Sequence, residues 1–279
     1  MNLMIIYYEQ SRIQDHKEEK QMELPDITYH KSPPLAYITL DRAETRNAFT
    51  QEMMDSLCRA FGDAKEDAGI KVIILGGRGA AFCAGANIKD LADGKYEAWG
   101  MKHFLWRHVQ RIPLLLEDVD KPVIGSIGGP AYGAGFDLAL ACDVRIASEK
   151  ATFCSAFIRL GLVPGDGGIY YLPRLVGVSK ALDILLTGRV INMNEALRIG
   201  LADRVVPAEK LEAETKNYAM EMAQWPLEPL RAVKRAVYSG LKSDLRGHLD
   251  YISSQQALLT QTEEHRTAVK KLVDSENKE

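Results

Sequence analysis

The sequence predicts a layered α/β fold followed by a mostly helical C-terminal third. Two short, continuously apolar runs, at residues 71–77 and 123–127, are typical of strands covered on both faces. Each run leads into a glycine-rich turn and then a helix, which favours a parallel sheet with right-handed crossovers. Beyond about residue 168 the pattern is almost purely helical. A chain of 279 residues suits one large domain, or one domain with an appendage.

The N-terminal part divides into an extension, a hairpin and a helix. Residues 1–25 are polar after the first eight and charge-rich, so we expect an accessory extension. Residues 27–42 read ITYH, the turn KSPP and LAYITLDR, which predicts a β-hairpin. Residues 51–68 form an apolar helical stripe with Thr50 as the N-cap. The stripe consists of Met54, Leu57, Phe61 and Ala64.

The alternation of strand, turn and helix then continues to the Pro/Gly-rich stretch GLVPGDGG. We expect a glycine-rich loop running into a helix after the first apolar strand, then a helix over about 96–118. The second apolar strand, the turn GGPAYGAG, a helix and the strand VRIAS follow. The expected units are therefore an α/β core at 26–205 and a C-terminal helical region at 206–279.

The composition is that of an ordinary soluble globular protein. Hydrophobic residues make up 46%, charged residues 26%, and the formal net charge is −3, which argues against nucleic-acid binding through bulk charge. The four cysteines lack metal-ligand spacing and are expected to be reduced core thiols. No signal peptide and no run long enough for a membrane span is recognised, so a cytoplasmic protein without membrane or nucleic-acid partners is expected.

The two glycine-rich turns have the same arrangement of buried strand, small residues and helix N-terminus. The first includes Gly85 and the second includes Gly133 and Gly135. A helix N-terminus offers unpaired N–H groups and partial positive charge, which suit an oxyanion. Small side chains allow a ligand to approach the backbone closely.

Other glycine-rich motifs do not fit these turns. A dinucleotide fingerprint needs GxGxxG, a P-loop needs Gly-Lys-Ser/Thr, and a nucleophile elbow needs GxSxG; each spacing fails here. A structural interpretation stays open, in which the glycines only permit tight packing between strand and helix.

From about Ile27 onward the chain resembles the crotonase (enoyl-CoA hydratase/isomerase) superfamily. The resemblance is carried by LDRAETRNAF, AFCAGANIKDL, GGPAYGAGFDLALACDVRIAS, LGLVPGDGGIYYLPRLVG and LTGRVINMNEALRIGLADRVV, in that order. It implies a layered ββα-superhelix core with a C-terminal helical subdomain, fatty-acid metabolism, and homotrimers or hexamers. It also implies an acyl-CoA substrate whose thioester oxygen binds the backbone N–H groups of Ala86 and Ala134.

The resemblance further implies which residues bind the substrate and which carry out proton transfer. The implied binding residues are Glu44, Thr45, Arg46, Ala84, Asn87, Ile88, Gly133 and Phe157. A hydratase of this family uses two glutamates, and these positions hold Asp137 and Phe157 here. Since phenylalanine cannot transfer a proton, Asp137 and Asp166, in PGDGG, become the acid–base candidates. For each, a structural role at a helix start or a turn stays open.

The expected activity is that of an enoyl-CoA hydratase/isomerase acting through a thioester enolate. Two N–H donors stabilise such an enolate by about 3–4 kcal/mol each. Isomerisation is favoured over hydration, because one carboxylate can move a proton whereas water addition uses two. The alternatives are an acyl-CoA hydrolase of the same fold and a non-catalytic binding protein. No metal or other cofactor is expected, since coenzyme A is part of the substrate.

Overall fold

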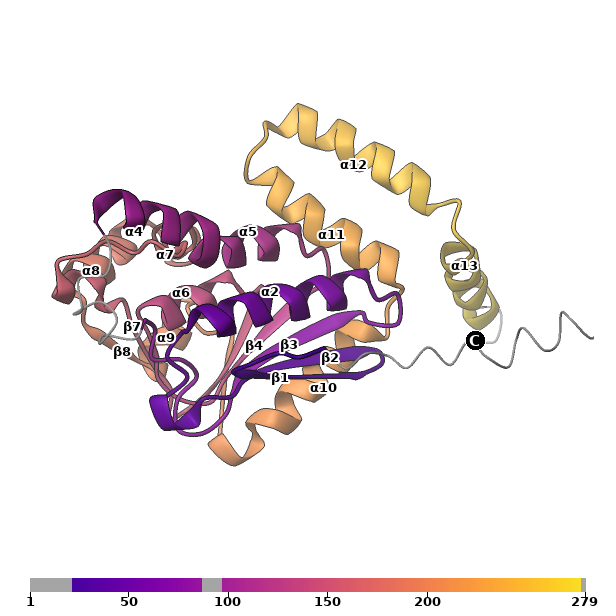
Figure 1. Ribbon diagram of the computed structural model, residues 1–279. Coiled ribbons are helices and arrows are strands. Elements are labelled where there is room, and N and C mark those ends of the chain that lie inside the picture. Colours follow the sequence, from indigo (N-terminus) through magenta and orange to yellow (C-terminus); the bar gives the residue numbers. More distant parts are fainter. Residues whose placement is uncertain (1–21, 87–96, 277–279) are drawn as a thin grey trace, which may run out of the picture.

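A six-stranded sheet forms the centre of the computed structural model, which describes residues 22–86 and 97–276 (Figure 1). Its strand order is β1-β2-β3-β4-β6-β9. Only the β1–β2 hairpin is antiparallel, and the later pairs are parallel. The strands are β1 (Ile27–Ser32), β2 (Leu35–Leu40), β3 (Val72–Gly77), β4 (Val123–Ile127), β6 (Val144–Ser148) and β9 (Arg204–Val206). The predicted α/β fold is confirmed.

Helices cover both faces of this sheet, which explains the continuous apolar runs. In β3, Ile73 and Leu75 belong to one buried cluster, and Val72 and Ile74 belong to the other. Three helices pack over the first cluster: α2 (Gln51–Glu66), α5 (Arg111–Asp118) and α6 (Ala134–Ala141). On the opposite face lies α10 (Leu211–Ala223), which follows the short η4 (Ala208–Lys210) (Figure 1). A strand buried on both faces has no reason to alternate polar with apolar residues.

The predicted start of α2 is confirmed at the level of single atoms. Thr50 has an extended backbone, and its Oγ1 accepts a 3.0 Å hydrogen bond from the N–H of Met53. That bond satisfies one of the donors left free at a helix start. Met54, Leu57 and Phe61 are buried, as the stripe predicts.

A second, three-stranded sheet carries the turn that enters α6. It pairs β5 (Ala131–Tyr132), β7 (Thr152–Cys154) and β8 (Val190–Asn192) in that order. The prediction of almost purely helical structure after residue 168 is wrong at β8 and β9. Strands of three residues are too short to show a period in the sequence, and their pairing partners lie far away along the chain. The helices around them are α7 (Gly168–Val176), α8 (Val178–Thr187) and α9 (Met193–Arg198).

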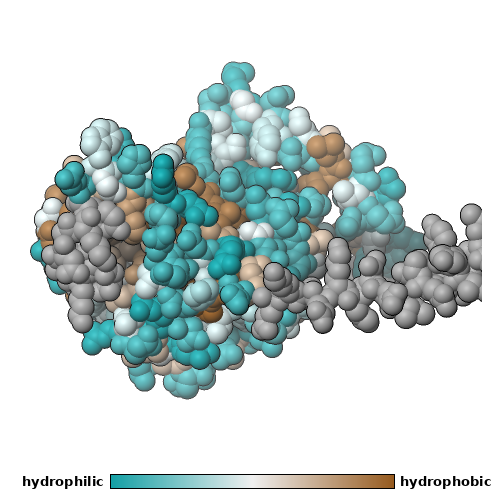
Figure 2. Space-filling view, viewed as in Figure 1, coloured by the Kyte–Doolittle hydropathy of each residue, from teal (hydrophilic) through white to brown (hydrophobic). Residues whose placement is uncertain are grey.

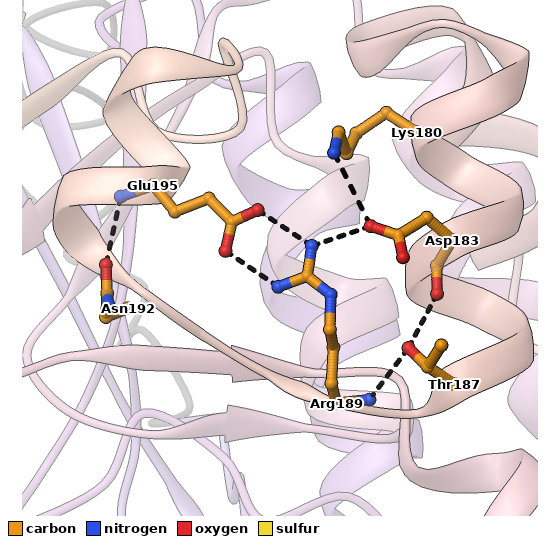
Figure 3. A network of polar contacts seen from close by, with 6 residues as sticks. All are labelled: Lys180, Asp183, Thr187, Arg189, Asn192 and Glu195. Atoms are coloured by element: carbon orange, nitrogen blue, oxygen red, sulfur yellow. Dashed lines mark hydrogen bonds and ion pairs between the residues drawn. The ribbon is translucent and has the colours of Figure 1, made fainter.

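A polar network ties β8 to the helices on either side of it (Figure 3). The guanidinium of Arg189 donates to both carboxylate oxygens of Glu195 at 2.7 Å and to Asp183 at 2.8 Å. Asn192 caps α9 by accepting the N–H of Glu195 at 3.0 Å. Bidentate arginine–carboxylate pairs fix orientation as well as distance. The network therefore holds in place the strand that completes the small sheet.

The helix predicted over 96–118 is interrupted by a wide turn. It consists of α4 (Ala98–Phe104), a π-helical turn, η2 (Leu105–Val109), and then α5. The N–H of Gln110 donates to the carbonyl of Leu105 at 2.8 Å, five residues back. A π-turn inside a helix accommodates one extra residue and often accompanies function.

The last three helices leave the core. They are α11 (Leu227–Gly240), α12 (Leu245–Leu259) and α13 (Glu263–Glu276). Asp244 caps α12 by accepting the N–H groups of Arg246 and Gly247 at 3.0 Å. Figure 1 shows α12 and α13 projecting from the body, and Figure 2 shows apolar surface where they meet. Among the described helices, none is both long and apolar enough to cross a membrane.

Candidate active site at two touching glycine-rich turns

The two glycine-rich turns lie directly against one another. Tyr132 N–H donates to the carbonyl of Cys83 at 2.9 Å, and Cys83 N–H donates to Pro130 at 3.2 Å. A Cβ at Gly85, where φ is +90°, would lie 2.6 Å from the oxygen of Tyr132 and 3.0 Å from the nitrogen of Ala134. The position of Gly85 therefore accepts only glycine. The glycines therefore do permit tight packing, and this packing brings the segment around Ala86 next to the start of α6.

The backbone N–H groups of Ala86 and Ala134 have no protein acceptor within the described part of the chain. Ala134 is the first residue of α6, so its N–H has no carbonyl of its own helix to reach. At Ala86 the chain pairs with Phe49, whose N–H donates to Gly85 at 2.8 Å. That pairing uses the carbonyl of Gly85 and leaves the N–H of Ala86 unused.

The segment 44–46 lies beside the first turn. The carbonyl of Arg46 accepts the N–H of Ala84 at 2.9 Å, which joins the two segments. Glu44, Thr45 and Arg46 are exposed, with Glu44 and Thr45 in η1 (Ala43–Thr45). Two other expected binding residues, Asn87 and Ile88, lie outside the described residues.

Asn47 supports this region and was not singled out from the sequence. It is fully buried in a left-handed conformation, with φ at +56°. Its Nδ2 donates to the carbonyls of Arg78 and Ala81, both at 2.9 Å, and its Oδ1 accepts the N–H of Arg42 at 2.8 Å. Asparagine tolerates this backbone conformation better than most residues, which is the signal that the motif RNAF offered.

The carboxyl groups of Asp137 and Asp166 come together although they are far apart in the sequence. Asp137 is only 1% exposed in the first turn of α6. Its Oδ2 accepts the N–H of Gly168 at 3.0 Å, and its Oδ1 is buried without a partner. A Cβ at Gly168 would lie 2.0 Å from Oδ1, so glycine is required there. Gly168 is a second residue that the sequence did not single out.

Burial changes the acidity of both groups. It raises the pKa of Asp166 to about 6. It also raises the pKa of Asp137 well above its usual value, and the charge of Asp166 raises it further. The N–H groups of Gly168 and Asp166 partly oppose this second shift. Two carboxyl groups in one buried site do not both ionise readily, so the pair tends to hold one proton near neutral pH.

One small cavity joins Asp166 to the start of α6. Its volume is about 20 Å³, and its walls are mostly apolar. The residues around it are Phe49, Met54, Val109, Ile112, Pro113, Ala134, Leu138, Ala141 and Asp166. Asp137 and Phe157 are not among these residues. Asp166 is therefore the carboxyl group that shares a cavity with Ala134, and its charge acts on the buried carboxyl group of Asp137.

The remaining expected binding residues have backbone roles in the structure. Gly133 has φ at +53°, and its N–H donates to Cys154 at 2.9 Å, which links β5 to β7. Phe157 is half-buried in η3 (Ala156–Leu160), and its carbonyl accepts the N–H of Leu162 at 3.0 Å. Within residues 22–86 and 97–276, no group of three or more histidine, cysteine or acidic residues is arranged to hold a metal ion.

Comparison with known proteins agrees with this architecture. The family model described as enoyl-CoA hydratase/isomerase matches residues 30–277. A probable enoyl-CoA hydratase of Rhodobacter capsulatus is 36% identical over 91% of this chain and 96% of its own length.

Two solved structures are similar to this chain. A Bacillus anthracis enoyl-CoA hydratase has a TM-score of 0.85 and 31% identity, covering 90% of this chain and 96% of its own. A monofunctional enoyl-CoA isomerase from M. smegmatis has a TM-score of 0.68 and 34% identity, covering 80% and 98%. With this fold and these relatives, the chain belongs to the enoyl-CoA hydratase/isomerase family, the crotonase superfamily.

Proposed function

We propose that this protein isomerises the double bond of an acyl-CoA thioester, and that the N–H groups of Ala86 and Ala134 bind the thioester oxygen. The supporting observation is the cavity shared by Ala134 and Asp166. It brings a residue with an unpaired backbone donor and a residue with a carboxyl group to the wall of one small apolar space. That is the arrangement needed to remove a proton next to a polarised carbonyl.

In the proposed reaction, Asp166 carries the proton. Its carboxylate removes a proton from C2 of a 3-enoyl-CoA, and the electron pair of the C–H bond forms an enolate. The enolate oxygen accepts hydrogen bonds from the N–H groups of Ala86 and Ala134. The protonated Asp166 then returns the proton to C4, so the formula is unchanged and the double bond has moved to C2. A pKa of about 6 suits this exchange, since the group can accept and release a proton near neutral pH.

Asp137 acts on Asp166 and not on the substrate in this proposal. It is almost fully buried, and the Asp166 charge raises its pKa. Asp137 therefore keeps a proton while Asp166 changes its own charge. A neutral neighbour avoids a second negative charge beside the enolate.

Two observations favour isomerisation over hydration. Phe157 stands where a family hydratase has its second glutamate, so one acid–base group is missing. The cavity beside Asp166 is also lined mainly by apolar side chains. A reactive water needs about two to four polar partners, which these walls do not supply.

Coenzyme A binding is proposed at the exposed segment Glu44–Arg46 and at Ala84–Ile88, of which the structure describes residues 84–86. Arg46 has no carboxylate partner among the described residues, so its cation is available for a phosphate. The backbone carbonyl of Arg46 accepts the N–H of Ala84, so the residue that carries this cation is joined to the first glycine-rich turn.

A homotrimer or hexamer, in the cytoplasm, completes the proposal. Val178, Leu182 and Leu186 recur every four residues along α8 and are 67%, 48% and 67% exposed. Such a stripe suits another copy of the same chain. Analytical ultracentrifugation tests this, with Leu182→Glu expected to give smaller species. A wild-type monomer at micromolar concentration contradicts it.

The reaction is tested by incubating the protein with a panel of 2-enoyl- and 3-enoyl-CoAs in D₂O. Mass spectrometry separates the outcomes. Deuterium with an otherwise unchanged formula supports isomerisation, added water indicates hydration, and free coenzyme A indicates hydrolysis. Coenzyme A ester binding without turnover indicates a binding protein. Asp166→Asn is expected to slow isomerisation by about 10²-fold or more.

A further inference from the structure

The turn that carries Asp166 has little hydrogen bonding of its own. Residues 163–166, all within the described part, take part in no backbone–backbone hydrogen bond. The neighbouring Gly167 has φ at +108°. A glycine-rich turn without internal bonds samples many conformations unless something outside it fixes it.

The π-helical turn before α5 makes two contacts with this turn. Nε2 of Gln110 donates to the carbonyl of Gly165 at 3.0 Å. A Cβ placed on Gly165 would lie 3.6 Å from both terminal methyl groups of Leu105, so that side chain packs beside the same residue. In a regular α-helix, residues five apart point about 140° from one another. The π-turn brings Leu105 and Gln110 onto one face.

The peptide between Gly165 and Asp166 connects Gln110 to the acid pair. Its carbonyl accepts the hydrogen bond from Gln110. Its N–H, which belongs to Asp166, favours the charged form of Asp137 and so opposes part of the rise in the pKa of Asp137. A hydrogen bond at the carbonyl end of a peptide polarises the N–H end. One side chain at the end of the π-turn thus fixes the plane of the peptide whose N–H belongs to Asp166.

We propose that Gln110 is a positioning residue that orients the Gly165–Asp166 peptide and thereby sets the arrangement of the two carboxyl groups. The effect of Gln110 on catalysis rests on the proposed function. The structural part of the inference, the link from Gln110 to Asp137, holds independently of the substrate.

Among the described residues, the charge of Asp166 raises the pKa of two titratable groups, the carboxyl group of Asp137 and the thiol of Cys83. Burial raises the pKa of the Cys83 thiol to about 12, so it stays neutral over the range in which the acids titrate. A change in the titration of Asp137 therefore reports on its bonds with the 165–168 backbone and on Asp166.

The test substitutes Gln110→Met, which keeps approximately the same volume but removes the donor. Gln224→Met is the matched control, because Gln224 also donates from its amide to a backbone carbonyl, at 2.9 Å, on α10. Carbon-13 NMR of labelled aspartate follows both acids, with signals identified through Asp137→Asn and Asp166→Asn. This readout needs no turnover.

Loss of Gln110 is expected to raise the titration midpoint of Asp137, because the N–H of Asp166 is no longer held toward its charged form. We also expect kcat to fall by between about 10-fold and 10²-fold with KM unchanged. The Gln224→Met variant should match wild type in the titration midpoint of Asp137 and in kcat. A Gln110→Met protein that titrates like wild type overturns the inference. If wild type is inert while the midpoint moves, the proposed function fails and the positioning role stands.

Discussion

Replacing Asp166 by asparagine should stabilise the protein above neutral pH while it removes activity. Asp166 makes no side-chain hydrogen bond or ion pair within the described residues, so the substitution breaks none. Asparagine has nearly the same shape and no charge. The difference between the two proteins is therefore mainly the cost of a buried negative charge.

The size and sign of this effect follow from the pKa of Asp166. In the folded protein it is about 6, compared with 3.8 for a free aspartate. A shift of about 2 units corresponds to about 3 kcal/mol, which we take as the upper end. Because the folded pKa is raised, the native state binds more protons between these values. The contribution of Asp166 to stability is therefore most favourable below about pH 4 and declines as the pH rises to about 6.

Urea unfolding at pH 4 and pH 8, followed by tryptophan fluorescence, measures this. The free energy of unfolding of the Asp166→Asn variant should be higher than that of wild type by about 1–3 kcal/mol at pH 8, and by much less at pH 4. Asp250→Asn, at an exposed aspartate on α12, is the control and should show no such dependence. An equal difference between Asp166→Asn and wild type at both pH values would refute the reasoning.

Three further substitutions probe the supports of the site. Gly168→Ala should lower the free energy of unfolding by about 1–3 kcal/mol and kcat by about 10²-fold, because its Cβ would meet the Asp137 carboxyl group. Gly62→Ala, where a Cβ meets open space, is the control and should stay near wild type. Equal behaviour of the two variants would contradict the packing argument. Asn47→Ala should lower the free energy of unfolding by about 1–3 kcal/mol in urea titrations, because the buried carbonyls of Ala81 and Phe82 and the part-buried carbonyl of Arg78 lose a donor. Arg46→Ala should raise KM for the acyl-CoA in low salt and change it little in high salt, because salt screens an exposed charge. An effect on KM that does not depend on salt would contradict phosphate binding by Arg46.

Local signals made much of the fold predictable. The apolar run of β3, the Thr50 cap and the stripe of α2 each depend on neighbours within a few residues, and each is found as expected. The contact between the two glycine-rich turns was implied by the family resemblance. The structure adds its physical cause, which is that a Cβ at Gly85 or Gly135 would collide with the opposite turn.

Other features depend on contacts that no local pattern encodes. The strands β8 and β9 exist through pairing with residues far along the chain. The π-turn at Leu105–Val109 interrupts a segment whose sequence predicts one continuous helix. The neighbouring positions of Asp137 and Asp166 arise because α7 begins against α6, which packs Gly168 onto the Asp137 carboxyl group.

The central claim is that backbone N–H groups stabilise the thioester enolate, and Ala134 allows a direct measurement. Ala134 is the first residue of α6, a position where proline fits a helix but has no N–H to donate. We predict that Ala134→Pro lowers kcat for enoyl-CoA isomerisation by about 10²–10³-fold, whereas Ala134→Gly, which keeps the N–H, stays close to wild type. A folded Ala134→Pro enzyme that turns over as fast as Ala134→Gly would contradict the claim.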